Sequence, residues 1–111
     1  MTRGAASPEE LETLLEDAFL IHDEQALPGL FAGHAVLSSA DGRLDARGRP
    51  DIARRIGAIW DQGGDYLPHA PRIVQTGPTA LVLAGPAVHV VSRTGGTWQY
   101  LISWLGPAQP S

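Results

Sequence analysis

The spacing of apolar residues divides the chain into a helical first half and an extended second half. Up to about residue 60, apolar positions recur every three or four residues, the spacing that gathers them on one face of a helix. From residue 71 the period shortens toward two, which is typical of strands that present alternate side chains to a core. Helices gathered before strands predict an α+β domain in which the helices pack on one face of a curved antiparallel sheet.

The first predicted helix covers residues 8–21. Ser7 is a good N-cap residue, Pro8 suits the first helical position, and Glu10, three residues after the cap, completes a capping box. The apolar side chains of this helix form one stripe: Leu11, Leu14, Leu15, Ala18 and Ile21. Its glutamates are expected on a solvated face: Glu9, Glu10, Glu12 and Glu16.

Two further helices are expected before residue 62. Asp23 suits the cap of a short helix, which Pro28 should kink or shorten because proline lacks an N–H donor. The apolar residues of that helix are Ala26, Leu27, Leu30 and Phe31. Pro50 suits the start of a third, amphipathic helix, whose apolar face carries Ile52, Ile56, Ile59 and Trp60.

The strands are bounded by glycine-containing turns. Short extended segments are expected at residues 35–39 and 44–47, and longer antiparallel strands at residues 72–76, 79–84, 87–93 and 98–105. The whole chain, residues 1–111, is expected to form one domain, with residues 1–6 and 107–111 as loose tails.

Composition excludes several classes of site. The chain has no cysteine, which excludes disulfides, thiolate metal sites and a cysteine nucleophile. A net charge of −4, with eight arginines scattered from Arg3 to Arg93, disfavours nucleic-acid binding, since that requires a concentrated positive face. No window approaches the roughly 18 apolar residues of a membrane span, so the expectation is a cytoplasmic protein that does not enter membranes. No spacing of histidines and carboxylates matches a known metal site, and no cofactor is expected.

Four short segments occur in the order and spacing of one known superfamily: residues 22–32, 48–52 (Gly-Arg-Pro-Asp-Ile), 79–82 and 88–100, which ends in Gly-Thr-Trp-Gln-Tyr. With the predicted elements, they resemble the nuclear transport factor 2-like superfamily, which includes ketosteroid isomerases and SnoaL-type polyketide cyclases. The resemblance implies a cone-shaped sheet with three N-terminal helices on its concave face and a pocket for a small hydrophobic molecule.

The resemblance also implies where catalytic groups would lie. The ketosteroid isomerases carry a carboxylate base where this chain has Ser39, and a tyrosine near the position of Leu15, so steroid-type isomerisation is disfavoured. The third catalytic position falls at His89, within an otherwise apolar strand. A histidine there could act as a general acid or base near neutral pH. The alternative is a partly buried histidine that is hydrogen-bonded across the sheet.

Alternation separates two sets of side chains on the last strand. The resemblance places one set toward the cavity: Gln99, Leu101, Ser103 and Leu105. The other set would then form an apolar outer face suited to a homodimer: Trp98, Tyr100, Ile102 and Trp104. The alternative is that the faces are inverted and these aromatic residues belong to the core.

Three functions are compatible with these observations. The first is a SnoaL-like enzyme that cyclises, isomerises or dehydrates a hydrophobic small molecule, with His89 as acid or base. Its pocket would be shaped by Leu15, Ser39, Trp60, Leu101 and Ser103. The second is a non-catalytic module that binds an apolar ligand or a protein. The third is a purely dimeric structural domain. All three stay open because a fold alone does not fix a function.

Overall fold

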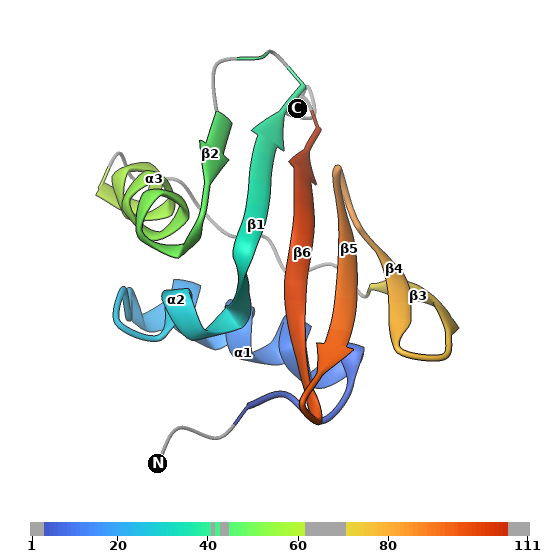
Figure 1. Ribbon diagram of the computed structural model, residues 1–111. Helices are drawn as coiled ribbons and strands as arrows, with labels where there is room; N and C mark the ends of the chain where they lie inside the picture. The colour runs from blue at the N-terminus through green and yellow to red at the C-terminus, as the bar shows by residue number, and fades with distance from the viewer. Residues whose placement is uncertain (1–3, 41, 43–44, 62–70, 107–111) are drawn as a thin grey trace.

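The computed structural model describes residues 4–40, 42, 45–61 and 71–106, and the side chains of residues 59–61 lie outside that description (Figure 1). The helices are α1 (Pro8–Ile21), α2 (Leu27–Leu30) and α3 (Arg49–Asp61). The strands are β1 (Phe31–Ser39), β2 (Asp45–Arg47), β3 (Arg72–Thr76), β4 (Thr79–Ala84), β5 (Ala87–Thr94) and β6 (Thr97–Leu105).

The strands form one six-stranded sheet in the order β2-β1-β6-β5-β4-β3 within the described chain. Every neighbouring pair is antiparallel except β1 and β6, which run parallel. Figure 1 shows α1 crossing behind the sheet and α3 beside β2. The predicted α+β architecture, with helices on one face of a curved sheet, is confirmed, and the parallel pair is an addition to it.

Helix α1 has the predicted bounds because its first turn is capped as expected. The Ser7 Oγ accepts a hydrogen bond from the Glu10 backbone N–H at 3.1 Å. The Glu10 carboxylate accepts from the N–H of Ala6, also at 3.1 Å, rather than from that of Ser7. The predicted apolar stripe is buried at Leu11, Leu15 and Ala18, whereas Ile21 at the end of the helix is 73% exposed.

The segment before α1 is attached to the sheet. Ala5 is buried and forms an isolated antiparallel bridge with Trp98, whose N–H donates to the Ala5 carbonyl at 3.0 Å. The expectation of a loose tail through residue 6 is therefore wrong at Ala5, because the start of β6 offers a backbone partner. Residues 107–111 lie outside the described part of the chain.

The boundary between α2 and β1 differs from the prediction. Helix α2 begins after Ala26 without a side-chain cap, so Asp23 does not cap it. Phe31, expected in the helix, is extended and opens β1 opposite Tyr100, with ring centroids 5.2 Å apart. The pairing of Phe31 with β6 thus overrides the local helical spacing. The guanidinium of Arg49, at the start of α3, donates to the Phe31 carbonyl at 2.8 Å and fixes α3 beside this corner.

The predicted long strands agree with β3 to β6 to within one residue at each end. Inward side chains of the sheet and buried side chains of α1, α2 and α3 form one core. Its largest fully buried members are Tyr100, Leu11, Leu27, Leu37, Ile52, Val82 and Val91. None of the helices in the described chain is long and apolar enough to cross a membrane.

A β-bulge in β6 corrects the expected alternation. Val91 lies opposite Tyr100 but its neighbour Val90 lies opposite Ile102, so Leu101 is an extra residue on β6. An extra residue exchanges the two faces beyond it. Before the bulge Trp98 and Tyr100 point into the core, and after it Ser103 does. Ile102 and Trp104 are 46% and 41% exposed on the outer face. The outward placement is therefore wrong for Trp98 and Tyr100, and full inversion of the strand is wrong as well.

Candidate functional site

Four polar side chains meet inside the protein, between α1 and the sheet. They are Glu12 from α1, His89 from β5, and Tyr100 and Ser103 from β6, and each is no more than 6% exposed. We call these four residues the buried polar cluster. Buried polar groups are costly unless they find hydrogen-bond partners, so the partners decide what the cluster can do.

Glu12 and Tyr100 form the first pair. The Tyr100 hydroxyl donates to the Glu12 Oε1 at 2.6 Å. Glu12 reaches the sheet because it shares the buried side of α1 with Pro8, Leu11 and Leu15. Tyr100 faces inward together with Trp98, and the bulge that follows lets Ser103 face inward as well.

His89 and Ser103 form the second pair. They lie directly opposite each other in the β5–β6 register, and the His89 Nδ1 lies 2.8 Å from the Ser103 Oγ. The His89 ring also packs against the ring of Tyr100, with centroids 4.7 Å apart. Its second nitrogen, Nε2, points toward the first pair.

The two pairs meet across a short gap. The His89 Nε2 lies 3.9 Å from the Glu12 Oε1. That distance is too long for a good hydrogen bond, so the two atoms are not hydrogen-bonded to each other. A carboxyl oxygen and an imidazole nitrogen therefore lie side by side without a direct hydrogen bond.

Burial shifts the two titrations toward the uncharged forms. Burial raises the pKa of Glu12 above 4.5, with a smaller contribution from the nearby Glu16, while the hydrogen bond from Tyr100 works against the increase. Burial lowers the pKa of His89 from 6.5 to about 4. His89 is therefore neutral at pH 7. Groups with shifted pKa values that share one location are typical of acid–base sites.

The sequence-predicted site residues are partly brought together. His89 and Ser103 are bonded partners, in the cross-sheet geometry that was the alternative for His89. Ser39 lies on the same face, because it is two residues beyond Leu37, the neighbour of Ser103 in the sheet. Leu15 is buried one turn along α1 from Glu12.

Two other predicted pocket residues are placed differently. Leu101 is the half-buried residue at the bulge rather than a regular inward position. Trp60 belongs to α3, but its side chain lies outside the described part of the structure. Within that part, no three histidine, aspartate or glutamate side chains gather in a way that could hold a metal ion.

Sequence reasoning missed Glu12 and Tyr100. Glu12 was expected on a solvated face of α1, yet it is 6% exposed. The available signal was its helical position, four residues after Pro8 and three before Leu15, which places it within the apolar stripe. For Tyr100 the sequence held no such signal, because its direction depends on the bulge.

Comparisons with known proteins identify similar structures only. No known family model matches the chain, and no curated protein matches it. A ketosteroid isomerase-like protein from Erwinia carotovora atroseptica superposes with a TM-score of 0.75 at 18% identity, over 92% of this chain and 94% of that one. A candidate dehydratase of the nuclear transport factor 2-like family from Streptomyces avermitilis has a TM-score of 0.70 at 21% identity, over 90% and 92%. A protein of that type with a cystatin-like fold from Novosphingobium aromaticivorans has a TM-score of 0.73 at 18% identity, over 93% and 80%.

Proposed function

From the nuclear transport factor 2-like fold of this chain and its buried acid–base groups, we propose that the protein is a small-molecule enzyme of the isomerase, cyclase or dehydratase type. The observation that carries the proposal is the meeting of Glu12 and His89, 3.9 Å apart and both nearly inaccessible to water. These reactions all require a proton to leave one atom of a hydrophobic substrate and another to be supplied nearby.

In this proposal Glu12 carries the proton. Its raised pKa brings a carboxyl group closer to neutral pH, where it can both accept and return a proton. The Tyr100 hydroxyl fixes the carboxyl orientation and stabilises its charged form. His89, neutral at pH 7, contributes the Nε2 atom to hydrogen bonding while Ser103 holds its Nδ1. The proposal therefore differs from the role predicted for His89: the acid–base group is Glu12 on α1, and its carboxylate takes the place of the one absent at Ser39.

A model proton abstraction tests the assignment of Glu12. In 5-nitrobenzisoxazole a base removes the C3 proton, the ring N–O bond breaks, and the single product is 2-cyano-4-nitrophenolate, which carries both the new nitrile and the phenolate. A desolvated carboxylate accelerates this elimination. We expect wild-type protein to exceed the buffer rate and Glu12→Gln to lose about 100-fold or more of that excess. Phenolate absorbance follows the reaction.

Glu9→Gln is the matched control, since it removes an exposed carboxylate one turn earlier on α1. Glutamine at position 12 can still accept the Tyr100 hydrogen bond, so urea unfolding should show a folded variant. Catalysis that persists in Glu12→Gln, or a wild-type rate equal to buffer, would contradict the assignment.

A second role, self-association through the outer sheet face, is favoured by a separate observation. The pairing registers place one apolar row across five strands: Val74, Leu81, Val90, Ile102 and Val36. Large apolar side chains on this face are strongly exposed: Val74 57%, Leu81 38%, Ile102 46% and Trp104 41%. Figure 1 shows no helix of the described chain in front of β4 to β6.

A second copy of the chain suits this outer row. Its residues carry no charge, so a two-fold related copy meets them with the same apolar surface and without like-charge repulsion. Exposed apolar patches of this extent mark interaction surfaces in soluble proteins. We propose a homodimer through this face, which leaves the buried polar cluster on the opposite side of the sheet.

A further inference from the structure

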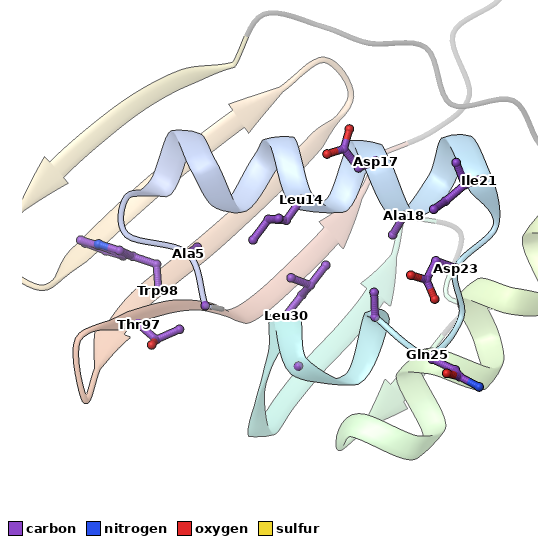
Figure 2. Close-up of a pocket in the computed structure, with 13 residues that line it drawn as sticks. Ala5, Leu14, Asp17, Ala18, Ile21, Asp23, Gln25, Leu30, Thr97 and Trp98 are labelled. Atoms are coloured by element: carbon purple, nitrogen blue, oxygen red, sulfur yellow. The ribbon is translucent and has the colours of Figure 1, made fainter. Parts of the chain in front are cut away.

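A groove lies on the side of α1 that faces away from Glu12, apart from the buried polar cluster. It has a volume of about 480 Å³ and lies between the N-terminal segment, α1, α2 and the start of β6 (Figure 2). Volumes of 300–1,000 Å³ are typical of small-molecule sites, as a rough guide. The groove is therefore large enough for a ligand of moderate size.

One stripe of α1 forms a wall of this groove. Leu14, Asp17, Ala18 and Ile21 line it at the spacing that places residues on one helical face. Glu12 and Leu14 are two residues apart, which separates them by about 160° around the helix. The groove and the buried polar cluster thus use different sides of α1.

Most of the residues that line the groove are apolar. Figure 2 shows Leu14 and Leu30 pointing toward each other from α1 and α2, with Trp98 at one end and Ile21 at the other. Ile21 is 73% exposed, and its neighbour Leu20 is 66% exposed. Apolar side chains at the rim gain most from a ligand that covers them.

The charged residues that line the groove are acidic. The lining includes the carboxylates of Asp17 and Asp23 and no arginine or lysine among the described residues. Within the described chain, neither carboxylate takes part in an ion pair or a hydrogen bond. An apolar floor with two unpaired carboxylates complements a molecule that has an apolar body and a positive head.

We propose that this groove binds small amphipathic organic cations, such as primary ammonium compounds with an aromatic or alkyl body. The body lies between Leu14 and Leu30 and reaches toward Trp98. The ammonium group lies near Asp17 and Asp23. The site is distinct from the proposed catalytic residues and does not depend on them.

Binding of 4-phenylbutylammonium, measured by amide chemical-shift changes in the chain of residues 1–111, tests the proposal. We expect saturable shifts of residues in the groove with a dissociation constant on the order of 1 mM, given the ligand's size. The probe 4-phenylbutyrate has the same body with the opposite charge and should bind at least about tenfold more weakly. Equal binding of the two probes, or shifts confined to the surroundings of His89, would overturn the proposal.

Two variants with equal net charge separate local from global electrostatics. Asp17→Asn with Asp23→Asn should weaken 4-phenylbutylammonium binding about 3- to 10-fold, the range expected for two exposed charge pairs. Glu9→Gln with Glu16→Gln changes the net charge equally but alters no residue that lines the groove, so binding should stay within about twofold. Equal losses in the two variants would contradict a local site.

A third variant tests the place of binding without changing charge. A Cβ atom on Gly29, which lines the groove, would meet no heavy atom within 4 Å. Gly29→Leu should therefore fold and partly fill the groove, weakening both probes. Unchanged affinity in this variant would show that the cation binds elsewhere.

Discussion

Burial lowers the pKa of His89 and raises that of Glu12, so the two residues affect stability at opposite ends of the pH range. The pKa of His89 is lowered to about 4 in the folded protein, so protonation of this residue favours the unfolded chain. The pKa of Glu12 is raised above 4.5, so its ionisation favours the unfolded chain. The stability contributed by His89 is complete above pH 6.5 and is lost as the pH falls through about 4. That contributed by Glu12 is complete below pH 4.5 and is lost as the pH rises through its folded-state pKa.

The acid limb of stability should therefore depend on His89. Between pH 7 and pH 4 the shift from 6.5 to about 4 corresponds to a loss of about 3 kcal/mol of unfolding free energy. In His89→Asn, where the amide nitrogen can still reach Ser103, we expect that loss to disappear. Urea unfolding across the pH range measures it. His34→Asn, at an exposed site on β1, should keep the wild-type profile. If stability falls equally with pH in His89→Asn and wild type, the pKa of His89 does not change on unfolding, which would contradict the prediction.

Single residues were predictable where the pattern around them was simple. His89 stands in an apolar strand, and its inward direction follows from the alternation with Ala87 and Val91. Glu12 was not predicted because a carboxylate on a surface helix is usually solvated. The hydrogen bond from the Tyr100 hydroxyl offsets part of the free-energy cost of burying it. Contacts between residues 88 positions apart are beyond local spacing rules.

At the scale of elements, the bulge at Leu101 lets both Tyr100 and Ser103 face the core, although they are three residues apart. A regular strand would point them to opposite faces. Trp98 and Tyr100 fill the core before it, and Ser103 meets His89 after it. The helix cap and the turn residues of the chain are local signals, and they located α1 and the long strands correctly. The bulge has no comparable local signal, because it is fixed by which side chains the core and α1 accept.

Deletion of Leu101 should cost far more stability than truncation of its side chain. Without the extra residue, either the two aromatic side chains or Ser103 must leave the core. Loss of one large aromatic residue from a core costs about 3–5 kcal/mol. Leu101→Ala keeps the bulge and removes only a half-buried side chain, for which we expect about 1–2 kcal/mol. Urea unfolding compares the two variants, and similar losses would contradict this account of the bulge.

At the scale of the whole molecule, the sheet separates two surfaces of different chemical character. Its inner face, covered by α1, holds the buried polar cluster, and its outer face carries the apolar row that ends at Val36. The bulge connects them, because the same shift that turns Tyr100 inward turns Ile102 outward. A sequence with regular alternation on β6 would lack either the Tyr100–Glu12 contact or part of the outer row.

The outer row predicts a dimer that a single charge disrupts. Light scattering should give wild-type protein twice its chain mass of 11.8 kDa, and Ile102→Arg should give 11.8 kDa, because an unpaired arginine at the centre of an apolar interface is costly to desolvate. Leu20→Arg adds the same charge at a more exposed apolar position on α1 and should remain dimeric. A wild-type monomer at high concentration would contradict the outer row as an interface. If both variants remain dimeric, the copies associate through another face.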